Sequence, residues 1–290
     1  MPLRDILIAL VVIAIWGTNF VVIKYALGEL PPLLFATLRF VLVAFPAVFF
    51  LKRPAVPIRH LAIYGVLIGA GQFGLLYIAM THYISPGLAS LLLQMQVVFT
   101  IGLSMAINGE KIHPYQIGAV LLAGAGVAVI ALHAQGSVTP LGLALCIAAA
   151  ASWGVGNIVA RRAGRINMLA YVVWSSLFSV PPLLALSLFF EGPAAIATGL
   201  SHLDAGMLGA VVWQSAGNTM FGFSLWAWLL ARHPAATVSP MALMIPVFGM
   251  GASALLLGEP LQDWKLTAAA LVLGGLAVNF FWPLRTTFRR

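Results

Sequence analysis

Long apolar runs, separated by short polar segments, dominate the chain. A transmembrane helix needs about 20 predominantly apolar residues, and ten runs of about this length occur, while the alternating pattern of a β-barrel does not. The pattern therefore predicts an all-α polytopic membrane protein with ten transmembrane helices, and a short interfacial turn in the longest connection, 191–204. The ten runs cover about residues 5–27, 32–52, 60–82, 87–108, 114–133, 139–161, 168–190, 205–231, 235–257 and 264–284.

The same short motifs occur twice along the chain. Trp16-Gly17-Thr18-Asn19 opens the first half, and Trp153-Gly154-Val155-Gly156-Asn157 opens the second. Gly109-Glu110 closes the fourth apolar run and Gly258-Glu259 closes the ninth. Each match is short, but their common order indicates an internal repeat.

The repeat divides the chain into residues 1–135 and 136–290. Each part holds five predicted helices, an odd number, so the second copy enters the bilayer from the opposite side. Inverted repeats of this kind are typical of secondary transporters, which bind substrate near the membrane midplane between the halves.

Composition and charge agree with a membrane environment. The chain is 62% hydrophobic and 8% charged, whereas a soluble domain has about 25% charged residues. The net charge of +8 is spread over short loops. We therefore expect the basic residues to act as topology signals and to contact anionic lipid headgroups. We expect no nucleic-acid partner. The single cysteine, Cys146, lies in an apolar run and predicts neither a disulfide nor a metal cluster.

The placement of basic residues predicts the orientation. With the N-terminus in the cytoplasm, twelve Lys and Arg residues fall on the inner side, two (Lys24 and Lys265) fall on the outer side, and Arg39 lies within a run. This distribution follows the positive-inside rule. It predicts that both termini are cytoplasmic, and that Lys24 reaches the outer interface.

The motifs resemble those of a known family. The two Trp-Gly openings, Leu38-Arg39-Phe40, the glycine-rich fifth run and the two Gly-Glu pairs are similar to the EamA family of the drug/metabolite transporter superfamily, across nearly the whole chain. The segments 19–24, 43–47 and 87–96 resemble the EamA-type O-acetylserine/cysteine exporters. Many members carry a proline before both Gly-Glu pairs. Here Pro246 precedes the second pair, but the aligned position before the first pair is Val97. The resemblance implies a ten-helix inner-membrane exporter of small metabolites.

Polar side chains within apolar helices are costly in hydrocarbon, so they face the protein interior or a wet cavity. These residues and the deep tryptophans are the predicted substrate-binding set. The structural alternative is an interhelical hydrogen bond for Gln94 and for Gln96, and a place in the interfacial belt for the aromatic residues. Trp16, Tyr77 and Trp213 are further candidate cavity walls. The set is Asn19, Arg39, Gln72, Gln94, Gln96, Trp153, Asn157, Trp174, Gln214 and Asn218.

Two members of this set carry specific expectations. Gln94 and Gln96 lie about 200° apart on a helix, so one can line a cavity while the other bonds a neighbouring helix. Their amides suit a zwitterionic amino acid. All seven acidic residues lie near helix ends, so Arg39 has no evident carboxylate partner. Either a substrate carboxylate completes a bidentate pair with it, or it binds backbone carbonyls and stabilises the bundle.

The sequence also bears on mechanism. Without Asp, Glu or His deep in a predicted helix, we expect export down the substrate gradient with no proton relay. Glu110 and Glu259, at helix ends, are expected to cap or pin loops. No zinc-protease, rhomboid-type serine-protease or Walker-type motif occurs, so we predict no catalytic residue, metal or cofactor. The predicted cargo is a small polar amino acid or derivative such as cysteine or O-acetylserine. Another small metabolite or drug, a helical channel and a scaffold without transport are the alternatives.

Overall fold

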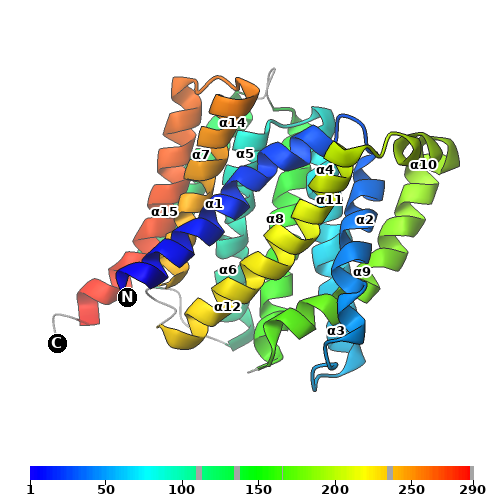
Figure 1. Ribbon diagram of the computed structural model, residues 1–290. Helices are drawn as coiled ribbons and strands as arrows, with labels where there is room; N and C mark the ends of the chain where they lie inside the picture. The colour runs from blue at the N-terminus through cyan, green and yellow to red at the C-terminus, as the bar shows by residue number, and fades with distance from the viewer. Residues whose placement is uncertain (109–112, 134–137, 165, 234–237, 288–290) are drawn as a thin grey trace.

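The computed structural model describes residues 1–108, 113–133, 138–164, 166–233 and 238–287. It is a bundle of long helices that lie side by side (Figure 1). Several positions used above lie outside the described residues. They are Gly109, Glu110, Lys111, Arg165, Arg289 and Arg290.

Helical segments make up both halves of the chain. The first half contains α1 (Leu3–Ala26), α2 (Pro32–Ala44), η1 (Ala47–Phe49), α3 (Ile58–Val66), η2 (Leu67–Gly74), α4 (Leu75–His82), α5 (Pro86–Leu92), η3 (Leu93–Met95), α6 (Gln96–Asn108) and α7 (Pro114–Leu132). The second half contains α8 (Pro140–Arg162), α9 (Met168–Phe190), α10 (Gly192–Ser201), α11 (Ala205–Val212), η4 (Trp213–Phe221), α12 (Gly222–Arg232), η5 (Ser239–Met244), α14 (Ile245–Leu257) and α15 (Asp263–Thr287).

Within the described ranges, eight helical stretches are long and apolar enough to cross a membrane, or nine if a bent pair counts as one span. A shorter apolar helix covers Met241–Leu257. The predicted run 235–257 begins in residues that the structure does not describe, so the ten-helix count stays a prediction. The remaining predicted boundaries lie within a few residues of the observed helix ends.

Proline sets the start of several of these helices. Pro32, Pro86, Pro114 and Pro140 each stand in the first turn of a helix. The fixed φ of proline suits a helix start, and its missing N–H is one that the first turn leaves without an intrahelical partner. Short connections with proline therefore separate the apolar runs into distinct helices.

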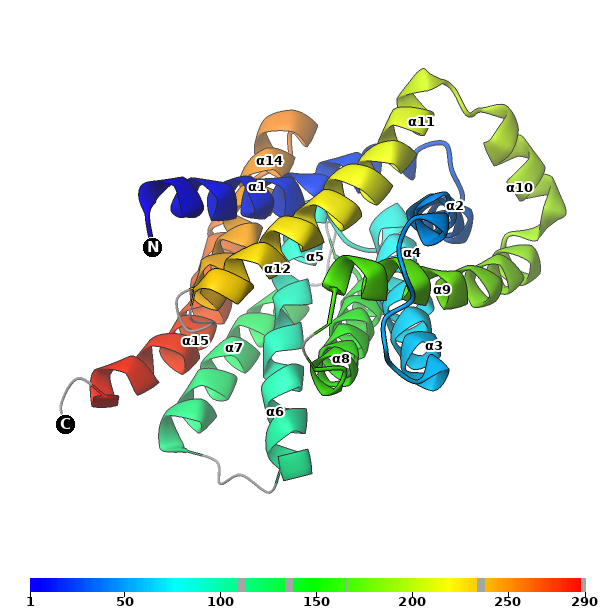
Figure 2. The ribbon, with the colours of Figure 1, turned by 60° about the horizontal axis from the view of Figure 1, so that its bottom comes forward.

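The connection 191–204 differs from the predicted turn, because it contains the ten-residue helix α10. Gly192 has a φ of 81° and Pro193 follows it in the first turn, which permits a new helix directly after α9. Asp204 then caps α11 by accepting a hydrogen bond from Met207 N at 2.8 Å. The α10 segment meets the following helix at 105° and lies at the edge of the bundle (Figure 2).

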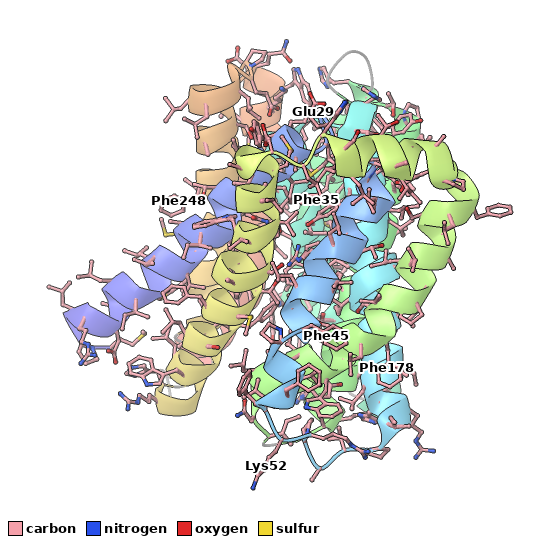
Figure 3. All side chains as sticks on the ribbon, turned by 45° about the vertical axis from the view of Figure 1, so that its right-hand side comes forward. Glu29, Phe35, Phe45, Lys52, Phe178 and Phe248 are labelled. Carbon is pink, nitrogen blue, oxygen red and sulfur yellow. The ribbon has the colours of Figure 1, made fainter. Side chains whose placement is uncertain are left out.

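The outer surface of the bundle is rich in apolar side chains. Large hydrophobic residues such as Phe50, Leu132 and Leu255 are more than four-fifths exposed, as expected where hydrocarbon is the solvent. The charged residues Glu29 and Lys52 lie at opposite ends of the bundle (Figure 3). The charges therefore leave an apolar band around the middle of the helices.

Two charged side chains tie helix ends together. Lys24 Nζ donates to the carbonyl oxygens of Met80 (3.1 Å) and Thr81 (2.7 Å), and its place at the outer interface stays a prediction. Those carbonyl groups lie in the last turn of α4, where no further helical N–H is available to donate to them. Glu259 pins a loop, as predicted: its carboxylate accepts from Gly87 N at 3.0 Å and pairs with the fully buried Lys265 at 2.9 Å.

Small residues allow close helix packing between the two halves of the chain. The last helices of the predicted repeats, α7 and α15, pack along each other. A Cβ added at Gly275 would lie 2.5 Å from the carbonyl oxygen of Ala119, whereas one at Gly274 would meet only Leu122 Cδ2 at 3.5 Å. Because lipid gives no hydrophobic drive for helices to associate, such contact between backbones is what holds them together.

We therefore predict opposite outcomes for two neighbouring substitutions. Gly275→Ala should lower the free energy of unfolding by ~1–3 kcal/mol through overpacking, despite the better helix propensity of alanine. Gly274→Ala should leave it unchanged or raise it by up to ~1 kcal/mol. Denaturant unfolding in detergent micelles compares the two, and equal effects would contradict the packing described.

Candidate functional site

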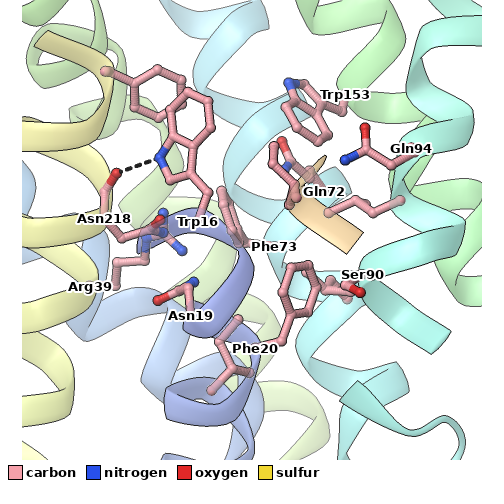
Figure 4. Close-up of a pocket in the computed structure, with 15 residues that line it drawn as sticks. Trp16, Asn19, Phe20, Arg39, Gln72, Phe73, Ser90, Gln94, Trp153 and Asn218 are labelled. Carbon is pink, nitrogen blue, oxygen red and sulfur yellow. Dashed lines mark hydrogen bonds between the residues drawn. The ribbon is translucent and has the colours of Figure 1, made fainter. Parts of the chain in front are cut away.

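A polar pocket lies inside the bundle (Figure 4). Its cavity volume is about 60 Å³, and its wall comes from α1, α2, η2, α4, α5, η3, α8, η4, α12 and α14. The polar lining residues are Asn19, Arg39, Gln72, Ser90, Gln94 and Asn218, and the lining aromatic residues are Trp16, Phe20, Phe73, Trp153 and Phe223. Residues from both predicted repeats thus surround one site.

Two π-helical segments present polar side chains to this pocket. The segment η2 carries Gln72 and the segment η4 carries Gln214 and Asn218. A π-helix bonds residues five apart and is frequent at functional sites. Within η4, Thr219 Oγ1 donates to the carbonyl oxygen of Gln214 at 2.8 Å, also five residues away. Each π-helical segment is the middle of the third predicted span of its half.

Arg39 is fully buried beside the pocket. Its Nη1 donates to Tyr77 Oη (2.8 Å) and Gln214 Oε1 (2.9 Å), and its Nη2 donates to Thr219 Oγ1 (2.8 Å). The guanidinium carbon also lies 3.6 Å from the centre of the Phe73 ring, a cation–π geometry. The alternative of backbone carbonyl partners is therefore wrong: the bonds described for Arg39 go to neutral side chains.

Gln214 connects the polar residues behind the pocket wall. Its Oε1 accepts from Arg39 and from Tyr77 Oη at 3.2 Å, and its Nε2 donates to Asn19 Oδ1 at 2.9 Å. Asn218 Nδ2 approaches the same oxygen at 3.4 Å. Gln214 is fully buried and does not itself line the pocket, so it positions the residues that do.

Besides Gln214, three predicted residues do not line the pocket. Gln96 Oε1 accepts from Asn157 Nδ2 at 2.7 Å, and Asn157 also donates to Thr100 Oγ1 at 3.1 Å. Trp174 Nε1 donates to the carbonyl oxygen of Leu51 at 2.9 Å. Of the glutamine pair, Gln94 lies at the pocket and Gln96 bonds α8, and a substrate contact for either stays a prediction. Their opposite directions on the helix explain the difference.

The sequence analysis missed several pocket residues. Phe20, Phe73 and Phe223 line the wall, and Thr219 binds Arg39. Phenylalanine is common throughout apolar helices, so its presence gives no signal of a cavity. The only sequence signal near the π-helical segments is glycine, with Gly69, Gly71 and Gly74 in the first and Gly217 and Gly222 at the second.

The cavity as seen in this structure is narrow. The volume available to the centre of a water-sized probe is about 60 Å³. That is more than the roughly 10–15 Å³ that a single water needs, so the pocket has room for more than one water.

The helices and the pocket define the class of protein. Apolar helices of spanning length that enclose a pocket with polar side chains make a multi-pass membrane protein with an internal cavity. The model of the EamA-like transporter family matches residues 3–132 and 140–281, which is nearly the whole chain. The chain belongs to the EamA-like transporter family, a family of transporters rather than enzymes, and is a multi-pass inner-membrane protein.

Curated relatives and a solved structure agree with this family. A probable amino-acid metabolite efflux pump of Salmonella typhimurium is 39% identical over 297 residues, covering 100% of this chain and 99% of that protein. A protein of the same description from Escherichia coli is 39% identical over 288 residues, covering 97% and 96%. A solved crystal structure has a TM-score of 0.64 at 20% identity and covers 95% of both chains. That likeness supports the fold alone.

The network around Gln214 generates a stability prediction. Gln214→Leu removes the acceptor for Arg39 and Tyr77 and should lower the free energy of unfolding by ~2–3 kcal/mol, because a buried charged donor loses its partner. Gln94→Leu removes one long hydrogen bond (3.4 Å, to the carbonyl oxygen of Ala242) and should cost under ~1 kcal/mol. Thermal unfolding of the two purified variants tests this, and similar losses would contradict the central role of Gln214.

Proposed function

We propose that the protein exports small metabolites by alternating access, and that its cargo is a small polar amino acid or derivative such as cysteine or O-acetylserine. The observation that carries the proposal is the polar pocket, which holds a buried arginine and four amides within apolar helices. Intramembrane polar groups of this kind mark substrate pathways. The relatives named as probable amino-acid metabolite efflux pumps support the direction and the cargo class.

The architecture proposed for this function has ten transmembrane helices in two inverted five-helix repeats, residues 1–135 and 136–290, with both termini in the cytoplasm. The family match falls in two stretches that correspond to these repeats. The π-helical segments η2 and η4 occupy the same place in each half. Substrate sites at the interface of two repeats, with rocking of one repeat against the other, are general for such carriers.

The proposed cargo contacts are the predicted residues that reach the pocket: Asn19, Arg39, Gln72, Gln94, Trp153 and Asn218. Within the described chain, no Asp, Glu or His lines it. We therefore keep the expectation that export follows the substrate gradient without a proton relay. A rate that followed an imposed proton gradient at fixed substrate concentration would contradict this part.

Counterflow of labelled cysteine and O-acetylserine in proteoliposomes tests the function. Wild-type protein should give saturable counterflow, as a carrier does and a channel does not. Asn19→Ala should reduce it at least ~10-fold, since a lost transition-state or binding contact of about 1.4 kcal/mol has that effect. Gln96→Ala, whose side chain lies off the pocket, is the matched control and should keep counterflow within about 2-fold of wild type.

No counterflow from well-folded protein would reject these cargoes, and uptake without saturation would favour the channel.

Labelling with a membrane-impermeant maleimide tests the orientation. Cys146 is buried and is the single cysteine of the sequence. The Cys146→Ser variant therefore has no native thiol. In this background, we expect Ser201→Cys, exposed at the end of α10, to be labelled in intact cells. Lys52→Cys, exposed after η1, should be labelled only after the membrane is permeabilised. The opposite pattern would place the termini outside.

A further inference from the structure

The pocket has one cationic end and one neutral end. Arg39, Asn19 and Asn218 lie together on one side, beside Trp16 (Figure 4). Gln72, Gln94 and Trp153 lie on the other side, and Phe73 lies between the two groups (Figure 4). A ligand that fills the pocket therefore meets different chemistry at its two ends.

The cationic end lacks a counter-ion. Every hydrogen bond described for the Arg39 guanidinium goes to a neutral oxygen, and its Nε has no partner among the described residues. Over the ranges that the structure covers, no Asp or Glu lines the pocket and none pairs with Arg39. A buried charge without an opposite charge is strongly unfavourable. The group that best complements a planar guanidinium is a carboxylate, which it binds in a bidentate manner.

Among the described residues, neither end of the pocket offers an anionic group that would select an ammonium group. The amides of Gln72 and Gln94 can donate and accept hydrogen bonds, but they carry no charge to balance a second cation. A zwitterion therefore leaves one positive charge in the pocket uncompensated, whereas a carboxylate with a neutral far end leaves none. Coulomb interactions are strong at the low dielectric of such a site, so this difference matters for binding.

We propose that the pocket recognises its cargo through a free carboxylate held at Arg39, and that the cargo's amino group can be acylated or absent. The substrate class is thus small carboxylates with a neutral hydrogen-bonding far end, which includes N-acylated amino acids. This inference rests on the proposed export function for its transport assay. It adds a rule about the charge of the cargo, called the charge rule below, which the names of the relatives given above do not state.

Competition against labelled cysteine in counterflow, under reducing conditions, tests the rule with four related ligands. Unlabelled cysteine is the zwitterion and N-acetylcysteine the anion, while cysteine methyl ester and cysteamine lack the free carboxylate. We expect N-acetylcysteine to compete at least as well as cysteine. The ester and cysteamine should need at least ~10-fold higher concentrations. Equal competition by cysteamine, or no competition by N-acetylcysteine, would overturn the inference.

A binding readout separates failure of this inference from failure of the proposed function. Ligands that bind the folded state raise the thermal midpoint of purified protein by mass action. If counterflow is absent but N-acetylcysteine raises the midpoint and cysteamine does not, the charge rule stands and the proposed cargo is wrong. If neither carboxylate raises the midpoint, the charge rule is wrong as well.

One variant supplies the missing charge from within the protein. In Gln214→Glu, a carboxylate replaces an amide whose oxygen lies 2.9 Å from Arg39 Nη1, with almost no change of shape. We expect this variant to fold, as its thermal midpoint reports, and to reduce the discrimination between N-acetylcysteine and cysteamine from at least ~10-fold to about 2-fold. Gln96→Glu, outside the pocket, is the matched control and should keep the wild-type discrimination. A folded Gln214→Glu protein that discriminated as wild type does would show that Arg39 does not bind the carboxylate.

Discussion

A buried cation with neutral partners organises the centre of this protein. Arg39 is fully buried in an apolar bundle, so its charge requires hydrogen-bond acceptors from neighbouring helices. Tyr77 comes from the first predicted repeat, while Gln214 and Thr219 come from the second. Their hydrogen bonds fix the positions of α2, α4 and η4 relative to one another. Asn19 joins the same network through Gln214, which places α1 against it.

The π-helical segments make this arrangement possible. A wider turn shifts the side chains that follow it relative to a regular α-helix, so Gln214 and Thr219 can reach Arg39 while Asn218 lines the cavity. Thr219 then returns a hydrogen bond to the Gln214 carbonyl oxygen, which satisfies a group within the widened turn. The local geometry of η4 and the chemistry of the pocket are therefore one feature.

The helices were predictable from the sequence because their length is a property of single segments. Hydrocarbon thickness predicted the run 32–52, which forms α2 and η1, and the run 168–190, which forms α9. The site was only partly predictable. Polarity shows that Gln96, Asn157 and Trp174 avoid lipid, but it does not show whether they face a cavity or a neighbouring helix. The π-helical segments depend on tertiary contacts, and glycines alone do not specify them.

The partners of Arg39 have a consequence for the order of biosynthesis. Gln214 lies 175 residues after Arg39 in the chain. At about 5–20 residues per second, the ribosome needs roughly 10–35 seconds to synthesise that interval. During this time α2 already carries its charged side chain, and the first repeat alone cannot satisfy it. Until the second half is synthesised, water or the insertion machinery must therefore keep the charge of Arg39 out of contact with lipid. The first half is therefore not a self-sufficient folding unit.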